Sequence, residues 1–370
     1  MSKKNSNVLN LKKHLKENNL FASIYKIFKL NLKTINSKNL LVAVSGGPDS
    51  LALAALTKLL NLEKNKKIFY VLVDHKIRKE SSKEAKSVKK LLKKFEINLV
   101  VIQNNELINK NVQGKAREIR YKLLSDFCRK KKIKHIITAH NSEDQVETFF
   151  IRLSRGSGIQ GLSSMKKISK LSSNVKLLRP LLSIRKKQLE SISKKIFGKV
   201  FRDPSNKDKK YLRTRIRQLN KYLTKSGINQ EQILRSIKNL ASTNETLNFF
   251  INKVYESCIK KDKNKIILNY KLFLSETSEI QMKVLSKAIK NFSNSESTIN
   301  NGSSISLYLY STFIGITIYI FTGQYKGITK YVGSYSLYFL SLRCLITSIT
   351  IYIFHSISKE ETYSSKTIIV

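Results

Sequence analysis

The chain has 370 residues, with 70 Lys and Arg against 25 Asp and Glu, which gives a formal net charge of +45. A chain of this length can form two or three domains with a substantial core, and so large a positive charge favours an anionic partner, with nucleic acid ahead of a membrane surface. The three cysteines are far apart and form no CxxC pair, which excludes a disulfide framework and a zinc site of the usual spacing. A compositional bias towards Lys, Asn and Ile that only decorates solvated surfaces remains the alternative explanation of the charge.

The N-terminal sequence MSKKNSNVLNLKKHLKENNL lacks the apolar core of a signal peptide. Together with the separated cysteines, this predicts a protein of the reducing cytoplasm. We assign residues 1–37 to a basic helical extension that precedes the first predicted strand.

Short β-branched runs alternate with helical patterns along the next 115 or so residues. The runs are continuous in apolar character, as buried parallel strands are: Leu40–Val44, Ile68–Val73, Leu99–Ile102 and His135–Thr138. Helix-spaced apolar positions occur at Leu51–Leu60, Ser82–Phe95, Gln113–Lys131 and Ser142–Leu153. The alternation predicts an α/β fold with a doubly wound, mainly parallel sheet over residues 38–210. Amphipathic helical patterns such as Gln230–Leu240 and Ser278–Phe292 then predict a mainly helical domain over residues 211–300.

Residues 301–370 differ in composition from the rest of the chain. They hold five Lys and Arg and two Asp and Glu, and Ser297–Tyr325 carries no charge at all. A membrane hairpin is one interpretation, because about 20 apolar residues can span a bilayer, but the segment is rich in Ser, Thr, Tyr and Gly. We favour a small strand-rich domain or a sequence that is not the native reading of the gene. We therefore expect no membrane association and draw no function from this tail.

The hexamer SGGPDS stands where the first predicted strand ends and the next helix begins. Its glycines allow backbone angles closed to other residues, and proline suits the first helical turn. The free N–H groups and the dipole of the helix then face an anion, with two serine hydroxyls as further donors, so the turn is predicted to hold phosphate. It is not a Walker loop, because GxxxxGK[ST] is absent, and an ordinary capped turn is the alternative. The residues of the turn are Ser45, Gly46, Gly47, Pro48, Asp49 and Ser50.

Two further predicted strands end in polar clusters. The second strand ends in DHKIR, which begins with Asp74 and His75, and the fourth ends in AHNSEDQVET, which contains His140. Open α/β sheets bind ligands at the carboxyl ends of their strands, so we expect these clusters to share one site with the glycine turn. A purely structural histidine is the alternative for each.

The last of these clusters opens a predicted helix. Ser142 is predicted as its N-cap, and Asp144 and Glu147 fall three residues apart on one face. His140 and Asp144 are candidates to converge on phosphate and Mg²⁺, since this hard cation prefers carboxylate oxygen. A cap beside a surface acid pair is the alternative.

Two arginine-rich segments and a glycine-rich segment complete the predicted site. GKAREIRY places Arg117 and Arg120 on one helix face, and the tract Arg202–Arg217 ends with three arginines at every second position. Arginines so placed suit the phosphates of ATP or of a polynucleotide, with solvated helix faces as the alternative. The segment GSGIQG is a literal GxGxxG, but it follows a predicted helix instead of a strand. We therefore reject a nicotinamide cofactor and predict a mobile glycine loop beside the site.

Taken together, these residues resemble the PP-loop (N-type) ATP pyrophosphatase superfamily and, within it, the tRNA(Ile)-lysidine synthetase family. SGGPDS matches the superfamily pattern SGGxDS, and the fold that this resemblance implies is adenine nucleotide alpha-hydrolase-like. The family blocks are matched in the expected order by DHKIR, GKAREIRY, AHNSEDQVETFFIRLSRGSGIQGLSSM, LRPLL and DPSNKDKKYLRTRIR. The likeness is strong over about residues 38–220 and loose over 220–295. Asn141 stands where the family usually has a second histidine, and Thr214 stands where it has an asparagine.

The resemblance implies an ATP-dependent ligation of free L-lysine to C2 of the wobble cytidine in a minor tRNA(Ile) with the anticodon CAU. This reaction passes through an adenylated cytidine and releases AMP and diphosphate. The implied catalytic residues are Asp49, His140, Asp144, Arg117 and Arg120, with Asp49 and Asp144 also as Mg²⁺ ligands. The implied ATP-binding residues are Ser45 to Ser50, Asp74 and His75. The implied tRNA-binding residues are Arg78, Arg155, Arg213, Arg215 and Arg217.

Two other functions remain as alternatives. A sister PP-loop enzyme such as a tRNA thiolase would generally need catalytic or cluster cysteines, and Cys128 lies alone within a predicted helix. A non-catalytic RNA-binding protein on a degenerate PP-loop scaffold is the alternative from a different class. The sequence leaves the oligomeric state open, with a homodimer as one alternative, and it does not identify the base-reading residues or the basis of discrimination against tRNA(Met).

Overall fold

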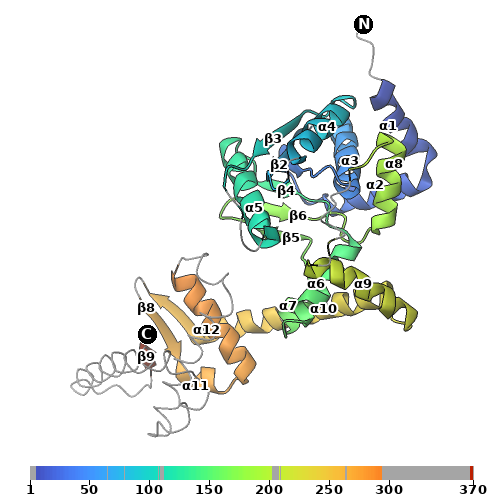
Figure 1. The fold of residues 1–370 in the computed structure, drawn as a ribbon. Coiled ribbons are helices and arrows are strands. Elements are labelled where there is room, and N and C mark those ends of the chain that lie inside the picture. Colours follow the sequence, from blue (N-terminus) through green and yellow to red (C-terminus); the bar gives the residue numbers. More distant parts are fainter. Residues whose placement is uncertain are drawn as a thin grey trace. The chain divides into compact units, whose positions relative to one another are not determined.

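The computed structural model describes residues 6–293, except 65, 79, 107, 109–111, 202–207, 209 and 263–264, and also residues 367–369. The chain divides into two compact units, Met1–Asn244 and Glu245–Val370 (Figure 1). The division falls inside one long helix, α10 (Gln230–Cys258). Each unit has its own sheet and its own apolar core.

A six-stranded sheet organises the first unit, in the order β3–β2–β1–β4–β6–β5. Neighbouring strands are parallel except β5, which runs antiparallel to β6. The chain adds β2 and β3 on one side of β1 and then crosses to the other side for β4, so β1 and β4 flank the topological switch point. The strands are β1 (Asn39–Ala43), β2 (Lys67–Asp74), β3 (Leu99–Gln103), β4 (His135–Ile137), β5 (Ile168–Lys170) and β6 (Lys176–Leu178).

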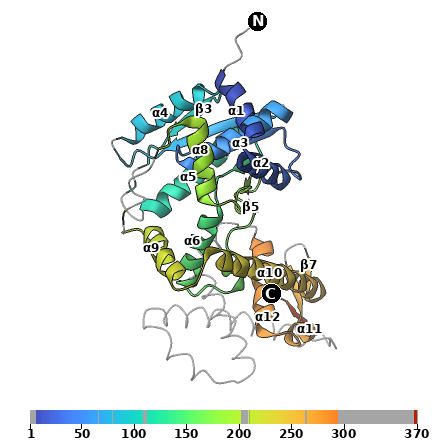
Figure 2. The ribbon, with the colours of Figure 1, turned by 90° about the vertical axis from the view of Figure 1, so that its right-hand side faces the viewer.

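Helices cover both faces of this sheet (Figures 1 and 2). Two helices precede the first strand, three connect the parallel strands, and the others follow β4. Their bounds are α1 (Ser6–Glu17), α2 (Asn19–Asn31), α3 (Pro48–Lys64), α4 (Ser81–Lys93), α5 (Val112–Lys130), α6 (Ser142–Leu153), α7 (Ile159–Leu162), α8 (Lys186–Phe197) and α9 (Leu212–Lys225).

The strand β1 contributes side chains to two separate cores because its side chains alternate between the two faces of the sheet. Leu40 and Val42 belong to the core that contains α1 to α4 and α8, whereas Leu41 belongs to the core under α5. The strand is therefore buried on both sides, which explains its continuous apolar sequence.

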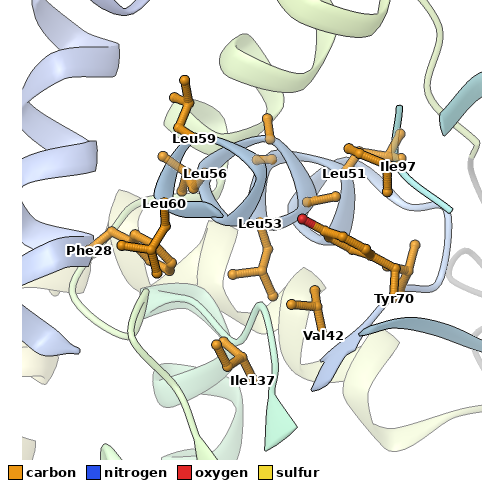
Figure 3. Packing of buried hydrophobic residues seen from close by; sticks show 14 of the residues in the cluster. Phe28, Val42, Leu51, Leu53, Leu56, Leu59, Leu60, Tyr70, Ile97 and Ile137 are labelled. Atoms are coloured by element: carbon orange, nitrogen blue, oxygen red, sulfur yellow. The ribbon is translucent and has the colours of Figure 1, made fainter. Parts of the chain in front are cut away.

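The helix α3 is buried on all sides from Ser50 to Leu60. Leu53 is fully buried and points from α3 towards Val42 of β1 and Ile137 of β4 (Figure 3). At the other end of the helix, Leu60 lies near Phe28 of α2 (Figure 3). Near the N-terminus, α1 and α2 are helices, and α2 contributes its apolar face to the core of the sheet.

The second unit combines helices with a small antiparallel sheet of order β7–β8–β9. The C-terminal part of α10 packs with the hairpin and α12 around a core that contains Ile251, Leu268 and Val284. The remaining elements are β7 (Ile259–Asp262), β8 (Lys265–Asn269), α11 (Tyr270–Leu274), α12 (Ser278–Ser293) and β9 (Thr367–Ile369).

The predicted α/β fold with a mainly parallel, doubly wound sheet is confirmed. The four predicted strands match β1 to β4 within one residue at each end, and the helix Ser142–Leu153 matches α6 at both ends. Sequence patterns missed β5 and β6, which have three residues each and are too short to show a period. They also missed the β7–β8 hairpin in a region predicted to be mainly helical.

The predicted domain boundaries at residues 37, 210 and 300 stay predictions. Apart from residues 367–369, the low-charge tail 301–370 lies outside the described residues. Within the described part of the chain, every helix is too short or too polar to cross a bilayer.

Replacing Leu53 by Ala should lower the free energy of unfolding by about 2–5 kcal/mol, because it opens a cavity between α3 and the sheet. The matched control is Leu62→Ala on the same helix, where the leucine is 38% exposed and the loss should stay below about 1 kcal/mol. Urea unfolding followed by circular dichroism measures both. Equal losses for the two variants would contradict the packing described for α3.

Candidate functional site at the carboxyl edge of the sheet

The turn Ser45–Ser50 joins β1 directly to α3. The strand ends at Ala43 and the helix begins at Pro48, so the predicted strand–turn–helix context is confirmed. The first N–H groups of a helix have no intrahelical acceptor, and the positive end of the helix dipole lies there. The turn therefore presents backbone donors at the carboxyl edge of β1, beside the switch point.

Gly46 sets the path of this turn. Its φ of +83° lies in the left-handed region, which glycine adopts freely and other residues rarely do. A Cβ atom at this position would lie 2.6 Å from Cγ2 of Val88 in α4 and 3.7 Å from Cβ of Phe201. The N–H of Phe201 also donates to the Gly46 carbonyl at 3.3 Å. Only glycine fits both the backbone angle and the space.

The hydroxyl of Ser50 holds the turn closed. Its Oγ accepts hydrogen bonds from the N–H of Ser45 at 3.1 Å and from the Ser45 hydroxyl at 3.2 Å, and it donates to the Gly47 carbonyl at 2.9 Å. Ser50 is buried, whereas Ser45 is exposed. Ser50 therefore shapes the turn, and Ser45 faces the side from which a ligand would approach.

The carboxyl group of Asp49, in the first turn of α3, lies among other charges at this edge. Its Oδ1 is buried and has no hydrogen-bond partner among the described residues. Burial raises the pKa of Asp49 to about 7. The positive charge of Lys186 opposes this rise, whereas the negative charges of Asp144, Glu143 and Glu190 add to it. A desolvated carboxyl oxygen beside a second carboxylate is a suitable ligand for a cation or an ammonium group.

The N-terminus of α6 is capped by Asn141. Its Oδ1 accepts the N–H of Asp144 at 3.1 Å, and the Asp144 carboxylate accepts the N–H of Asn141 at 3.0 Å, which forms a capping box. The prediction of Ser142 as the N-cap is therefore wrong by one residue. The N–H of Ser142 donates instead to the carbonyl of Ile184 at 3.0 Å. Asn141, which replaces the usual family histidine, has a structural role.

Asp74 at the end of β2 is bound by the start of α4. The hydroxyl of Ser81 donates to its Oδ1 at 2.8 Å, the hydroxyl of Ser82 donates to its Oδ2 at 2.5 Å, and the N–H of Lys76 donates to Oδ1 at 3.0 Å. Burial opposes ionisation, but these hydrogen bonds lower the pKa of Asp74 below its usual value. Asp74 thus positions α4 against β2, and a direct contact with ATP stays a prediction.

The pKa values of both predicted histidines are lowered at this edge. Burial and the charge of Arg120 lower the pKa of His75, against the opposing charge of Asp74, and its Nδ1 is buried without a partner among the described residues. Nδ1 of His140 lies 2.8 Å from the hydroxyl of Thr138. Burial is also the largest cause that holds the pKa of His140 well below its usual value, followed by four positive charges from Arg117, Arg179, Arg120 and Arg213.

These arginines form a cluster around His140. Arg117 and Arg120 project from α5 and lie over the ring of Tyr121, with centroid distances of 5.0 and 5.3 Å. Arg213 reaches the cluster from α9, far along the chain. Like charges held this close repel one another, so the cluster is set to bind an anion. The convergence of His140 and Asp144 on one phosphate–Mg²⁺ centre stays a prediction.

Sequence reasoning missed two arginines of this region, Arg152 and Arg179. Nη1 of Arg179 donates to the carbonyl of Lys166 at 2.8 Å and to the hydroxyl of Ser169 at 3.0 Å, while its Nε is buried without a partner among the described residues. Arg179 follows β6 directly, so recognising that three-residue strand would have placed it at the same sheet edge. Arg152 in α6 has no comparable signal in the sequence.

The glycine segment after α6 is tied down at its C-terminal end. Nη1 of Arg152 donates to the carbonyls of Gly161 and Ser164 at 2.7 and 2.9 Å. The amide of Gln145 exchanges two hydrogen bonds with the backbone of Met165, at 2.8 and 2.9 Å. The segment follows a helix, as predicted. Gly161 is therefore anchored to α6, and the mobility of the loop stays a prediction.

Of the arginines predicted to bind tRNA, only Arg213 joins the cluster. Arg78 pairs with Glu84 at 3.0 Å, and Arg155 and Arg215 are exposed. Arg217 of α9 pairs with Glu147, which is almost fully buried in α6, with Nη2 3.2 Å from Oε2. This ion pair fastens α9 beside α6 (Figures 1 and 2). The part of the tract at residues 202–207 and 209 lies outside the described residues.

The fold and this edge define a PP-loop domain, and comparison with known proteins agrees. The family model described as the PP-loop domain matches residues 18–223. The chain is also similar to a solved structure of the U34-tRNA thiolase NcsA from Methanococcus maripaludis with its [4Fe-4S] cluster, at a TM-score of 0.51 and 17% identity over 60% of this chain and 79% of that one. Likeness at this level concerns the fold alone.

Among curated relatives, the chain is 41% identical over 181 residues to the tRNA(Ile)-lysidine synthase of Orientia tsutsugamushi (strain Boryong), which is 49% of this chain and 41% of that protein. It is 34% identical over 262 residues to the tRNA(Ile)-lysidine synthase of Wolbachia pipientis wMel, and the match covers 69% of this chain and 60% of that protein. It is 32% identical over 255 residues to the tRNA(Ile)-lysidine synthase of Rhodopseudomonas palustris, and the match covers 68% of this chain and 73% of that protein. The chain belongs to the PP-loop family and, within it, to the tRNA(Ile)-lysidine synthase family. It spans less than two thirds of the length of the first two of these relatives.

Replacing Gly46 by Ala should lower the melting temperature, because an L-residue at φ +83° is strained by about 1–2 kcal/mol and its Cβ would overlap Val88. Gly47→Ala is the matched control, since its backbone is not left-handed and its Cβ would meet Ser45 Oγ at an ordinary 3.6 Å. Thermal unfolding monitored by circular dichroism compares the two. A Gly46→Ala protein as stable as Gly47→Ala would refute the strained turn.

Replacing Arg217 by Met should destabilise the first unit by about 3 kcal/mol or more, because it leaves the buried Glu147 carboxylate uncompensated. The double variant Arg217→Met with Glu147→Leu should recover most of this loss, since the buried charge is then gone. Urea unfolding of the wild type, both single variants and the double variant closes the cycle. A double variant as unstable as Arg217→Met alone would show that the ion pair does not fasten α9 to α6.

Proposed function

We propose that this chain catalyses the ATP-dependent ligation of L-lysine to C2 of the wobble cytidine in a tRNA(Ile) with the anticodon CAU, forming lysidine. The single observation that carries the proposal is the juxtaposition, at one edge of the sheet, of the glycine turn and the arginine cluster around His140. Membership of the tRNA(Ile)-lysidine synthase family supports the choice of substrates.

The glycine turn is the proposed site for the diphosphate part of ATP. Its backbone N–H groups and the α3 dipole offer donors to an anion, and the closed form of the turn is already set by Ser50. Because these donors are fixed before the reaction, they can stabilise the charge that develops on the leaving diphosphate without reorganising. The exposed hydroxyl of Ser45 donates to Ser50 Oγ in this structure and would have to turn away from it to donate to phosphate.

The acids beside the turn fit a magnesium ion bound together with phosphate. The buried Oδ1 of Asp49 has no hydrogen-bond partner among the described residues, and Asp144 is close enough for its charge to act on Asp49. No group of three or more metal-binding side chains occurs among the described residues, which suits Mg²⁺, because this ion keeps waters and phosphate oxygens and needs only one or two carboxylates. Such an ion would neutralise phosphate charge. Asp49 and Asp144 are also the candidates to orient the lysine amine.

The arginine cluster is the proposed site for the phosphate that is attacked. In the first step the C2 carbonyl oxygen of the cytidine forms a bond to the α-phosphorus of ATP, and the bond to the diphosphate breaks. Arg117 and Arg120 would spread the negative charge on the α-phosphate, and His140, whose pKa is held well below its usual value, would exchange a hydrogen bond with it. In the second step the ε-amine of lysine attacks C2, AMP leaves and the amine proton is released.

The other partners follow from the same proposal. Arg213 and Arg215 would close over the RNA, while contacts from Arg78, Arg155 and Arg217 stay predictions. The cytoplasmic location and a homodimer also stay predictions. A non-catalytic RNA-binding role is the competing function, and it predicts no tRNA-dependent exchange of label between diphosphate and ATP.

Replacing Asp49 by Asn should abolish the incorporation of labelled lysine into a tRNA(Ile) transcript and leave tRNA binding within about twofold, because only the carboxylate charge at the site is lost. The matched control Asp126→Asn removes a partly exposed acid that pairs with Arg129 at the end of α5, and it should react like the wild type. The measurement is mass spectrometry of nucleosides after incubation with ATP and labelled lysine. Full turnover by Asp49→Asn would remove Asp49 from the mechanism, and no lysidine from the wild type would refute the proposed function.

A further inference from the structure

The outer face of α4 carries lysines that the proposed reaction does not use. The inner face buries Ala85, Val88 and Leu92. The exposed face holds five lysines, which we name the α4 lysine strip: Lys83, Lys86, Lys89, Lys90 and Lys93.

The positive charge of the strip is not neutralised within the described part of the chain. Of the acids nearest the strip, Glu84 binds Arg78 at 3.0 Å and Glu96 lies 3.4 Å from the Nζ of Lys58, while Glu80, directly before α4, is exposed. No described carboxylate forms an ion pair with the five lysines of the strip. A row of uncompensated lysines on one helix face creates a positive potential that attracts a polyanion.

The strip begins at the candidate site. Ser81 and Ser82 at the start of α4 bind Asp74, which ends β2 at the carboxyl edge of the sheet. Farther along the helix, Val88 touches the glycine turn at Gly46. The inner face of α4 therefore lines the site. The lysines of the outer face lie about one helix diameter, roughly 10 Å, from the inner face. Figures 1 and 2 show α4 on the outside of the first unit.

We propose that the α4 lysine strip binds the phosphate backbone of the RNA that flanks the nucleotide in the site; this inference rests on the proposed function. Lysines three and four positions apart on a helix stand about 5–6 Å from one another, close to the spacing of successive phosphates. Lysine is a flexible point charge and suits phosphates more than base edges, so the strip would position the RNA without reading its sequence.

An anionic membrane is the other polyanionic surface that such a helix could meet. Helices that lie on membranes insert an apolar face opposite their basic face. In α4 that face is already buried against the sheet, because Val88 and Leu92 belong to the core. The geometry therefore favours RNA.

The test compares two triple variants that remove the same charge. Lys83, Lys86 and Lys90 are replaced by Gln in one protein, and Lys130, Lys131 and Lys134 in the other. The control lysines are exposed and lie between the end of α5 and the start of β4, at the opposite edge of the sheet. Lys and Gln have similar helix propensities, and thermal unfolding checks that both variants fold.

Fluorescence anisotropy with a labelled tRNA(Ile) transcript between 50 and 200 mM salt gives the affinity and its salt dependence. The strip variant should bind about tenfold or more weakly near 0.1 M salt, with the slope of log K against log[salt] reduced by about two, because each lost phosphate contact removes about 0.7–0.9. In lysine incorporation it should raise the KM for tRNA with little change in kcat, since the contacts are remote from the chemistry.

Equal effects of the two triple variants would overturn the inference and reduce the strip to general surface charge. Loss of binding to vesicles that contain phosphatidylserine, with tRNA binding unchanged, would assign the strip to a membrane instead. Neither result depends on catalysis. Absence of lysidine from the wild-type reaction would refute the proposed function while leaving the binding comparison intact.

Discussion

The left-handed backbone of Gly46 is the constraint on which the site depends. A strand buried on both faces must pass into a helix buried on all sides within four residues, and the turn between them is closed by Val88 and Phe201. A side chain at Gly46 would push these neighbours away and tilt the start of α3. The turn holds the N-terminus of α3 at the switch point between β1 and β4, the position at which open α/β sheets bind ligands.

Charges of both signs lie around this turn. The carboxyl groups of Asp49 and Asp144 act on one another and on the cations Lys186 and Arg217, and several arginines act on His140. Charges of both signs suit a reaction in which a polyanion is cleaved and an amine is added. Burial, together with the charges of these arginines, holds the pKa of His140 well below its usual value, which suits a hydrogen-bonding group better than another cation. The Glu147–Arg217 pair fastens α9 near this arrangement and thereby helps to bring Arg213 into it.

The sequence was informative where the local pattern and the fold agree. Continuous apolar strands and the SGGPDS turn located β1 to β4 and the edge at which they end. Two kinds of feature could not be predicted from the sequence. Three-residue strands such as β6 have no period, so Arg179 could not be placed beside His140. Interactions between distant segments were also hidden: Asp74 is engaged by Ser81 and Ser82, and Arg217 is engaged by a buried acid in α6. Residue type and strand position did not distinguish a ligand-binding group from one that supports its neighbours.

The most direct test of the central claim is a crystal structure with an ATP analogue that carries a methylene group between the α- and β-phosphorus atoms. We expect the β- and γ-phosphates to lie within hydrogen-bond distance of the backbone N–H groups of the Ser45–Ser50 turn, with the α-phosphate directed towards Arg117 and Arg120. A triphosphate bound away from this turn, with the turn free of phosphate, would contradict it.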